Sequence, residues 1–328
     1  MRYLSLFSGI EAASVACNGM GWEAMAFAEI DQFPSAVLAK RFPGVPNLRD
    51  VTKVNWRSFV KKCGRPDLVV GGSPCQSFSV AGTRTGLEGA SGLMWEYVRA
   101  VREVRPEWVL WENVPGALSS THGEDFRCLL EALDALGYGL AWRVLDAQFF
   151  GLAQRRERVF LVGRLGSRPP VEVLFEPESV PWDSKSSREK RKELAASAES
   201  GATCAGFKWH QGSGAGSIGL EDEQSPTLTA DYHNPAVLHL NAPVFAFGDG
   251  RQNQWAVRRL TPRECERLQG FPDDWTLIPW KGRPADECPD GPRYKAIGNS
   301  MAVPVMRWIF ERMDACAGVW QRSGSYDG

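Results

Sequence analysis

The sequence predicts an α/β protein with a parallel sheet and a second, smaller domain. Short apolar runs alternate with helical patterns through about the first 165 residues, and such alternation is typical of a parallel sheet covered by helices on both faces. After about Arg168 a charged, Ser/Ala-rich stretch and then a Gly-rich stretch replace this pattern. We therefore expect a first domain of residues 1–168, completed by residues 291–328, and a second domain of residues 169–290.

The first domain has an apolar strand before each candidate functional segment. The predicted strands are Tyr3–Phe7, Ala24–Glu29, Asp67–Gly71, Trp108–Trp111 and Val159–Gly163. The predicted helices are Glu11–Met20, Phe33–Arg41, Gly92–Val104 and Glu124–Leu136. Ligands of such sheets bind outside the carboxyl ends of the strands, so the residues that directly follow each strand are the candidates for a site.

The C-terminal part returns to helical patterns. Thr261 to Glu264 form a capping box with proline at the first helical position, and Gly270 is placed to end that helix. A final helix is predicted at about Met301–Ala315. A chain that leaves the first domain and returns to it in this way predicts two lobes.

Composition excludes several classes of protein. The formal net charge of −1 argues against a protein that coats nucleic acid, although arginines cluster locally at 155–158 and 251–267. Eight cysteines without C-x-x-C spacing indicate neither a disulfide framework nor a zinc site, so we expect no metal. The sequence lacks a signal peptide and any apolar run of roughly 18 residues, which predicts a cytoplasmic protein.

The first strand-to-helix turn indicates a weak nucleoside site. The strand ends at Phe7, a turn passes through Ser8 and Gly9, and a carboxylate able to hold a ribose follows the next strand at Glu29. The G-x-G-x-x-G pattern is absent, and Glu11 at the helix start would repel a phosphate. A nucleoside without phosphate, such as the positively charged S-adenosylmethionine, fits better. The alternative is an ordinary α/β turn.

The strongest segment is DLVVGGSPCQSFSVAG at residues 67–82. A buried strand runs into two glycines and Pro74, which hold Cys75 on a rigid turn at the carboxyl end of the strand. A thiol at that place is a candidate nucleophile. The alternative interpretation is a buried structural cysteine.

Two further strands carry polar residues at their ends. Glu112 follows the apolar run 108–111, where a partly buried carboxyl group can act as an acid. Arg156 and Arg158 lie near the start of the last strand, where they can contact an anion or a base carbonyl. The alternative for Glu112 is a salt bridge to Arg156 or Arg158.

Taken in chain order, these segments resemble one known family. The series is LFSG, Glu29, Asp50, GGSPCQ, ENV, QRRERVF, RRLTPRECERLQGFPDDW and YKAIGNSMAVPV. It is similar to the DNA (cytosine-5) methyltransferases of the single-module prokaryotic or phage type, from residue 3 to about 310 except for 169–255. The resemblance implies a Rossmann-like S-adenosylmethionine-dependent methyltransferase sheet with a smaller target-recognition domain in residues 169–290, which include the hinge.

The resemblance also implies a role for individual residues. Cys75 would be the nucleophile, Glu112 the partner of cytosine N3, and Arg158 a contact of the cytosine carbonyl with Arg156 nearby. The residues implied at the S-adenosylmethionine cofactor are Phe7, Ser8, Gly9, Ile10, Glu29, Ile30, Asp50, Val51, Pro74, Asn299 and Ser300. The residues implied at the DNA are Gln76, Ser77, Thr227, Leu228 and Arg251.

The chain departs from the family pattern at its first motif. The family usually begins Asp-Leu-Phe with a Gly-Gly pair shortly after. Here Ser5 replaces the aspartate, and Glu11 and Ala12 occupy the positions of the glycines. These differences bear on the affinity for the cofactor and leave Cys75 and Glu112 in place.

Three other functions compete with a DNA methyltransferase. One is a cytosine-5 methyltransferase acting on structured RNA, and another is a catalytically silent homologue that binds DNA. A third is an oxidoreductase with a redox-active Cys75, against which the missing phosphate loop and C-x-x-C motif argue. For the favoured function we expect double-stranded DNA as partner, a monomer without membrane contact, and a cognate restriction endonuclease as a functional partner. The expected location is the cytoplasm of a bacterium or of a phage-infected host.

Overall fold

The computed structural model describes residues 1–74, 92–175, 204–207, 220–222, 236–240 and 255–323. The chain divides into two compact units. The first comprises Met1–Leu145, Glu157–Val180 and Val305–Gly328, and the second comprises Asp146–Arg156 and Pro181–Pro304. This division differs from the predicted domains. Residues 146–156 and 291–304 group with the second unit, and residues 169–180 group with the first.

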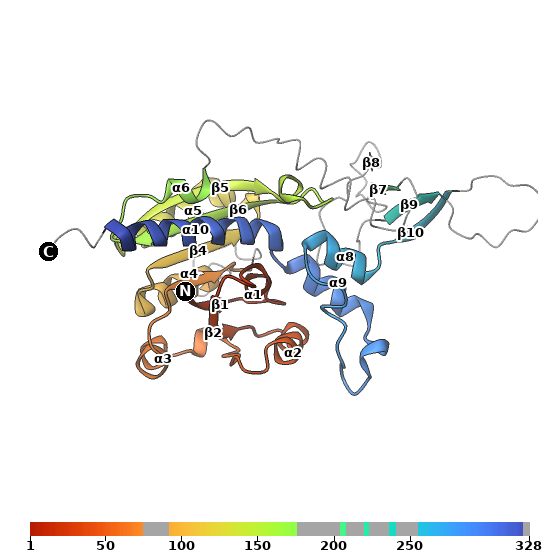
Figure 1. The fold of residues 1–328 in the computed structure, drawn as a ribbon, viewed down its shortest axis with the longest axis horizontal. Coiled ribbons are helices and arrows are strands. Elements are labelled where there is room, and N and C mark those ends of the chain that lie inside the picture. The colour runs from red at the N-terminus through yellow and green to blue at the C-terminus, as the bar shows by residue number, and fades with distance from the viewer. Residues whose placement is uncertain (75–91, 176–203, 208–219, 223–235, 241–254, 324–328) are drawn as a thin grey trace, which may run out of the picture. The chain divides into compact units, whose positions relative to one another are not determined.

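The first unit is built on a six-stranded sheet in the order β2-β1-β3-β4-β6-β5 (Figure 1). Parallel pairing joins β1 to β2 and β3, and β3 to β4, whereas β6 is antiparallel to β4. The expectation of a wholly parallel sheet is therefore wrong at β6. The strands are β1 (Arg2–Leu6), β2 (Glu23–Ala28), β3 (Leu68–Gly71), β4 (Trp108–Asn113), β5 (Tyr138–Asp146) and β6 (Glu157–Leu165).

The register of the central strands sets where a site can form. Leu6 of β1 pairs with Gly71 of β3, and Gly71 pairs with Trp111 of β4. All four residues of β3 are buried, as expected of a central parallel strand covered on both faces. The carboxyl ends of three adjacent strands therefore lie level, and the segments that follow them begin at one edge of the sheet.

Helices cover the sheet. The helices of this unit are α1 (Ala12–Ala16), α2 (Gln32–Arg41), α3 (Trp56–Cys63), α4 (Gly92–Val104), α5 (Glu124–Ala135), α6 (Val171–Leu174) and α10 (Val303–Ser323), whose first two residues belong to the second unit. Side chains of α3, α4 and α5 join alternate residues of the strands in one buried cluster, which includes Leu4, Val69, Trp111, Trp56, Tyr97 and Phe126.

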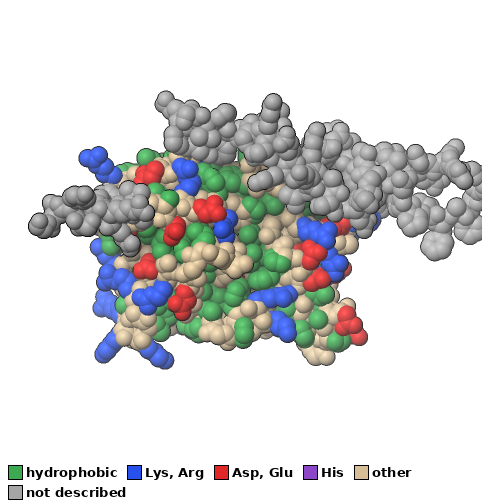
Figure 2. Space-filling model, in the orientation of Figure 1, with side chains coloured by type: hydrophobic (Ala, Val, Ile, Leu, Met, Phe, Trp, Pro, Cys, Tyr) green, Lys and Arg blue, Asp and Glu red, His purple; other side chains and the backbone are tan. Residues whose placement is uncertain are grey.

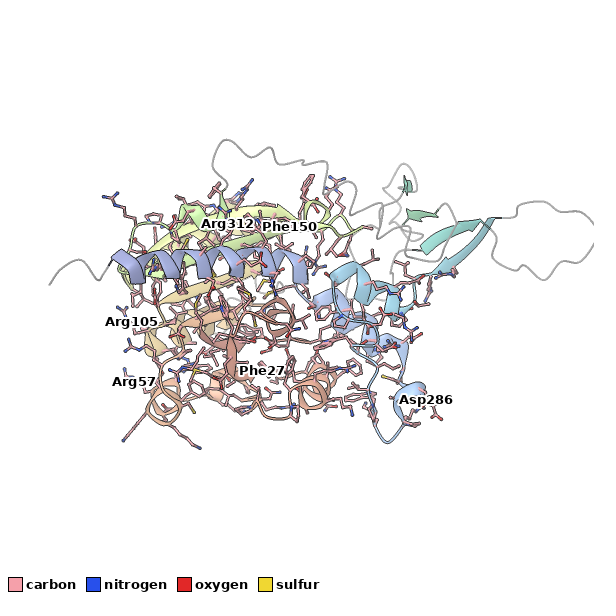
Figure 3. All side chains as sticks on the ribbon, viewed as in Figure 1. Phe27, Arg57, Arg105, Phe150, Asp286 and Arg312 are labelled. Carbon is pink, nitrogen blue, oxygen red and sulfur yellow. The ribbon has the colours of Figure 1, made fainter. Side chains whose placement is uncertain are left out.

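Contacts of α10 and α2 complete the packing. Phe310 of α10 lies 4.7 Å from Trp22 between ring centroids, and Arg307 donates to the carbonyls of Ala16 and Asn18. On β2, Phe27 is fully buried and meets Phe42 edge to face, with ring centroids 5.4 Å apart (Figure 3). The apolar core of the unit thus extends from the sheet to the helices.

Charged side chains of the first unit are mixed in sign on the surface. In the face that Figure 2 shows, Lys and Arg side chains lie beside Asp and Glu along α10. The ion pair of Arg307 with Glu311, at 2.6 Å, belongs to this helix. Such mixing agrees with the near-zero net charge of the chain. Among the helices of the described ranges, none has the length and apolar composition needed to cross a membrane.

The second unit combines a small antiparallel sheet with helices. Its strands lie in the order β10-β9-β7-β8. They are β7 (Cys204–Phe207), β8 (Leu220–Asp222), β9 (Ala236–Leu240) and β10 (Trp255–Arg259), and its helices include α8 (Pro262–Gln269) and α9 (Asp290–Asn299). The predicted capping box is confirmed: Thr261 accepts from the Glu264 amide, Pro262 begins the helix, and Gly270 ends it in the left-handed region.

Several elements differ from their predicted bounds. Helix α1 has five residues rather than the predicted ten, because the chain turns at Cys17 and takes left-handed conformations at Gly19 and Gly21. The last helix continues to Ser323 rather than ending near 315. The sequence analysis missed the strand β5 and the helices α3, α6 and α9. The expected loops of residues 183–200 lie outside the described residues.

Candidate active site

A carboxylate and a guanidinium meet where two strands of the first unit lie side by side. Glu112 is the fifth residue of β4 and pairs with Phe160 of β6, while Arg158 stands two residues before Phe160 on the same side of β6. Arg158 Nε lies 3.3 Å from Glu112 Oε1, and the two side chains are 15% and 12% exposed. The structure thus brings together two of the predicted catalytic residues, through the salt bridge that was the alternative interpretation of Glu112.

The chain that leads to Cys75 passes directly against Glu112. A Cβ added to Gly72 would lie 2.6 Å from the main-chain oxygen of Glu112 and 2.9 Å from Oε2 of its carboxylate. The neighbouring strand holds Ser73 as well, because Asn113 Nδ2 donates to its carbonyl at 3.0 Å. Only glycine can occupy position 72 without moving the carboxylate.

The described part of this segment ends at Pro74. Ser73 is buried, Trp111 Nε1 donates to its hydroxyl at 3.3 Å, and Pro74 is exposed. Cys75, Gln76 and Ser77 lie outside the described residues, as do Thr227, Leu228 and Arg251 of the predicted DNA-binding set. Their roles therefore stay predictions.

The turn after β1 is joined to the end of β2 by a buried carboxylate. Oε2 of Glu29 accepts from the amide of Gly9 at 2.8 Å, and Oε1 accepts from the amide of Asp31 at 2.7 Å. Burial raises the pKa of Glu29 above its ordinary value. Ser8 is fixed on the same strand, since its hydroxyl accepts from the Ala28 amide at 3.2 Å. The two predicted cofactor segments therefore form one continuous surface.

Apolar side chains flank this surface. Ile10 is fully buried, Phe7 is half-buried, and Ile30 is 62% exposed, a large apolar side chain left beside the Glu29 carboxylate. Phe7 has a φ of 53°, an unusual value for a residue with a side chain. A strained backbone next to an exposed apolar side chain and a carboxylate suits a nucleoside, whose base packs on apolar groups and whose ribose hydroxyls bind a carboxylate.

Asp50 lies after the chain segment that borders β2. Asn47 forms a parallel bridge with Phe27, which places the segment beside β2. Asp50 Oδ1 accepts from the amide and hydroxyl of Thr52 at 3.1 and 2.7 Å, and these bonds lower the pKa of Asp50. Val51, the next residue, is buried. The structure thus shows Asp50 capping a short helical turn, an N-cap role that the sequence analysis did not assign.

Among the described residues, three of the predicted site residues belong to the second unit. Arg156 is 2% exposed, and its Nη2 donates to the carbonyls of Gly298 at 3.1 Å and Ser300 at 2.6 Å. Asn299 and Ser300 therefore lie at the end of α9 that Arg156 holds. The sequence analysis placed Arg156 beside Arg158 at the base, but β6 begins only at Glu157, and the guanidinium of Arg156 is bound to main-chain oxygens instead.

The sequence analysis missed two residues of the site. Gly72 and Asn113 hold the segment before Cys75 against Glu112. The signal was present in each case: a glycine pair before Pro-Cys indicates a close approach of two chains, and a polar residue at a strand end indicates a contact with the next strand.

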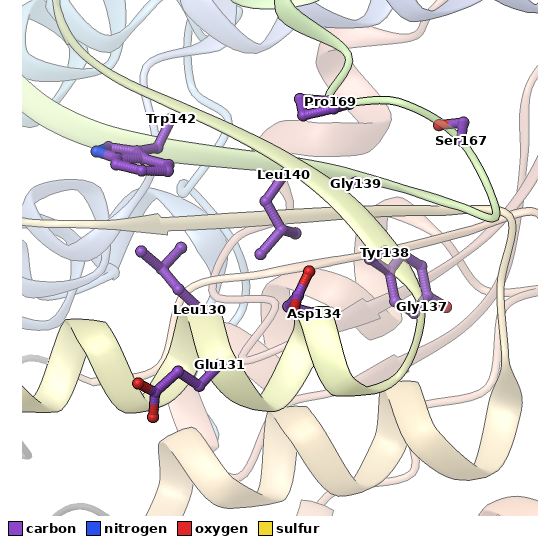
Figure 4. Close-up of a pocket in the computed structure, with 10 residues that line it drawn as sticks. All are labelled: Leu130, Glu131, Asp134, Gly137, Tyr138, Gly139, Leu140, Trp142, Ser167 and Pro169. Atoms are coloured by element: carbon purple, nitrogen blue, oxygen red, sulfur yellow. The ribbon is translucent and has the colours of Figure 1, made fainter.

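A hollow of about 570 Å³ lies elsewhere in the first unit (Figure 4). Its wall is formed by α5, the edge strand β5 and the chain around Ser167 and Pro169, with Trp142 and Asp134 among the lining residues. The residues predicted for the site are not part of this wall. Among the described residues there is also no group of three His, Cys, Asp or Glu side chains that could hold a metal ion.

Comparison with known proteins decides the family. The family model of the C-5 cytosine-specific DNA methylases matches residues 1–315. The chain belongs to this family. Family members use S-adenosylmethionine to methylate cytosine in DNA at C5, so the predicted α/β methyltransferase fold, the predicted activity and the predicted cofactor are confirmed.

Curated relatives of this methylase come from bacteria and phages. It is 32% identical to the type II methyltransferase M2.BsuMI of Bacillus subtilis over 95% of this chain and 75% of the relative. It is 27% identical to the type II methyltransferase M.DsaV of Dactylococcopsis salina over 95% and 86%. A protein of Escherichia phage P1 named DNA N-6-adenine-methyltransferase is 33% identical over 95% of this chain, which spans only 61% of the phage protein.

Solved structures share the fold of the methylase. The S. pombe Dnmt2 methyltransferase has a TM-score of 0.66 at 17% identity, covering 96% of this chain and 99% of that one. A putative DNA modification methyltransferase encoded within an E. coli prophage has a TM-score of 0.60 at 19% identity, with coverage of 96% and 99%. At this identity the likeness concerns the fold alone.

Proposed function

We propose that this methylase transfers a methyl group to C5 of a cytosine flipped out of a specific duplex DNA sequence, through a covalent bond between Cys75 and C6. The observation that carries the proposal is the contact of Gly72 with the Glu112 carboxylate, 2.9 Å from a Cβ at position 72. Cys75 follows Gly72 by three residues. Three residues span at most roughly 11 Å, so the chain is short enough to keep the Cys75 thiol within reach of a base bound at the Glu112–Arg158 pair.

The proposed chemistry begins at the pyrimidine ring. C5 of cytosine is a poor nucleophile, and addition of the Cys75 thiolate at C6 converts the ring to an enamine that is nucleophilic at C5. Glu112 gives a proton or hydrogen bond to N3 and so lowers the cost of this addition. S-adenosylmethionine, when bound, supplies the methyl group. Loss of the C5 proton then breaks the bond from C6 to sulfur and releases Cys75.

Arg158 is proposed to serve two partners. Its planar guanidinium carries several N–H donors. One of these nitrogens, Nε, lies 3.3 Å from Glu112 Oε1. A donor on the other side of the guanidinium would bind the cytosine carbonyl. We assign Arg156 to a supporting role in catalysis, since it binds the carbonyls of Gly298 and Ser300.

The proposed cofactor site follows the ends of β1, β2 and β3. The Glu29 carboxylate would hold the ribose, Ile30 and Phe7 would enclose the adenine, and Asp50 with Val51 would border its amino group. Ser8, Gly9 and Ile10 would lie along the amino-acid part, and Pro74 follows the end of β3. The roles of Asn299 and Ser300 at the cofactor stay predictions. The bond of Gly9 to Glu29, at 2.8 Å, supports this assignment because it makes the first two segments one surface.

Recognition of the target is proposed for residues 169–290 and for the residues after Cys75. The target cytosine must leave the duplex, since its C6 is not accessible inside the stack. Gln76 and Ser77, which follow Cys75, would then cover the flipped base. Thr227, Leu228 and Arg251 would contact the duplex. We further propose that the enzyme acts as a monomer in the cytoplasm of a bacterium or phage-infected cell, with a restriction endonuclease as its functional counterpart.

Transfer of tritium from labelled S-adenosylmethionine tests the proposal. The full chain should label duplex DNA and leave structured RNA unlabelled. Nucleoside analysis of the product should give 5-methylcytosine, and bisulfite sequencing of DNA from expressing cells should give the target sequence. Label found in N6-methyladenine, the product that the name of the phage P1 relative suggests, or in RNA would contradict the proposal.

A further inference from the structure

A second buried carboxylate lies under the cofactor turn and takes no part in the chemistry above. Glu11 is 1% exposed and stands between the turn Phe7–Ile10 and helix α1. Its backbone has a φ of 67° and a ψ of 64°, the left-handed region that residues with a side chain rarely adopt. A glycine would be free of this strain. The side chain of Glu11 must therefore contribute something that glycine lacks.

The Glu11 carboxylate is bound by three donors from two elements. On β1, Ser5 Oγ donates to Oε2 at 2.8 Å. On α1, the amide and the hydroxyl of Ser14 both donate to Oε1 at 3.1 Å. Tyr3, on the same side of β1 as Ser5, bonds to the Ser14 hydroxyl in turn. Together these bonds tie the end of the turn to the strand beneath it.

The same turn carries the residues assigned to the amino-acid part of the cofactor. The amide of Glu11 donates to the Ser8 carbonyl at 2.9 Å, and Ser8 Oγ donates to the Ser5 carbonyl at 2.9 Å. Ser5 therefore contacts both the turn and the carboxylate. A shift of the Glu11 side chain would move Ser8 and Gly9 through these bonds.

We propose that Glu11 is a positioning residue for the cofactor, whose ionised carboxylate holds the turn Phe7–Ile10 and favours the cationic S-adenosylmethionine over the neutral product S-adenosylhomocysteine. The proposal rests on the cofactor residues assigned under the proposed function. A charge buried beneath the site is screened by water and salt far less than a surface charge. The Glu11 carboxylate therefore attracts the positive sulfonium of S-adenosylmethionine. S-adenosylhomocysteine has a neutral thioether at that position and gains no such attraction.

Of the other ionisable groups near Glu11, Glu29 binds the same turn and also has a pKa raised by burial. Its titration is common to the wild-type protein and a Glu11 variant, so it cancels when the two are compared. Burial raises the pKa of Tyr3 on β1 and of Cys17 on α1, so both side chains stay neutral near pH 7. From α10, Arg307 donates to the carbonyls of Ala16 and Asn18 and stays charged throughout. Burial raises the pKa of Glu11 itself to about 7. Its charge is therefore adjustable in the range where the enzyme works.

Calorimetric binding of both ligands tests the proposal with Glu11→Gln. Glutamine can keep the geometry, with its oxygen accepting from Ser14 and its amide donating to Ser5, and it removes only the charge. We expect the affinity for S-adenosylmethionine to fall about tenfold at pH 8 and that for S-adenosylhomocysteine to stay within about twofold. Below about pH 5.5, where the Glu11 carboxyl group is largely protonated in the free protein and in the complex, the wild-type protein and the variant should converge. Titration of the cofactor's own amino group affects both proteins and cancels in their ratio.

Two further variants separate charge from structure. Glu23→Gln, at an exposed position on β2, removes the same charge from the surface and should leave both affinities unchanged. Ser5→Asp combined with Glu11→Gly returns a carboxylate to the strand end and relieves the left-handed strain, so it should retain the preference for S-adenosylmethionine. This double variant also decides the question if Glu11→Gln fails to fold.

The outcomes are distinct. Equal affinities of the wild-type protein and Glu11→Gln for both ligands at all pH values would overturn the proposal. Equal losses for the two ligands would overturn it as well, since they would show a structural role without charge selection. A wild-type protein that binds neither ligand would instead refute the proposed cofactor site.

Discussion

Arg158 Nε lies 3.3 Å from Glu112 Oε1, and both side chains are largely shielded from water. An ion pair of this kind keeps most of its electrostatic strength, unlike an exposed pair. It also matches the polar edge of cytosine, where N3 and the carbonyl oxygen are adjacent. In the proposed function Glu112 faces N3 and Arg158 faces the carbonyl. The pair is thus both a structural link between β4 and β6 and the centre of the proposed site.

Replacement of Glu112 by glutamine should abolish proton transfer while keeping the shape of the site. We expect kcat to fall by roughly 10²–10³-fold, the contribution of a positioned general acid, with little change in the affinity for S-adenosylmethionine. Glu107→Gln is the matched control, because Glu107 directly precedes the same strand at its opposite end and is exposed. Single-turnover methylation with tritiated cofactor measures the effect, and a loss below about threefold would argue against the acid role.

Gly72→Ala should disturb the site through a single methyl group. The added Cβ would lie 2.6 Å from the Glu112 carbonyl oxygen and 2.9 Å from its carboxylate, so either Glu112 or the chain before Cys75 must move. Such overpacking costs about 1–3 kcal/mol of stability, and we expect kcat to fall at least about tenfold because small displacements of reacting groups slow catalysis strongly. Gly44→Ala, where a Cβ meets nothing within 4 Å, is the control. Similar activity of the two variants would refute the proposed contact.

Arg156→Met should destabilise the end of α9. The change removes two hydrogen bonds from a buried guanidinium to the carbonyls of Gly298 and Ser300, and we expect a loss of about 3 kcal/mol in the free energy of unfolding. The neighbouring Arg155 is exposed, so Arg155→Met should cost no more than about 0.5 kcal/mol. Urea unfolding compares the two variants. Equal stabilities would show that these bonds contribute nothing net.

The buried carboxyl of Glu11 predicts a pH dependence of stability. Its pKa is about 7 in the folded protein against 4.5 as the ordinary value. Between these values the folded state binds more protons than the unfolded state, so stability falls as pH rises from about 4.5 to about 7 and levels off above. Relative to Glu11→Gln, the wild-type protein should lose roughly 3 kcal/mol across this window. Parallel curves for the two proteins would contradict the prediction.

The strand ends of the first unit could be predicted from the sequence because each apolar run is followed there by glycine, proline or polar residues. Phe7, Glu29 and Cys75 each follow a buried run, and the capping box at Thr261 is a local pattern complete within four residues. Local signals of this kind need no knowledge of the tertiary structure.

Other features depend on contacts between distant parts of the chain. Strand β6 runs antiparallel to β4. Its apolar sequence would suit a parallel or an antiparallel neighbour equally well, so the sequence did not predict this direction. Arg156 finds its acceptors 142 and 144 residues further along the chain. The left-handed backbone at Glu11 is retained because Ser5 and Ser14 bind its carboxylate. These bonds depend on the folded turn and could not be predicted from the local sequence pattern.

Covalent trapping tests the central claim, that Cys75 attacks C6 of the target cytosine. With 5-fluorocytosine at the target position of a duplex, fluorine at C5 cannot leave as the proton does, so the bond from sulfur to C6 should persist. We predict a denaturation-resistant complex of the wild-type protein with DNA, and none with Cys75→Ser, which should also be inactive. An adduct formed by Cys75→Ser, or no adduct from a protein that methylates ordinary cytosine, would contradict the account.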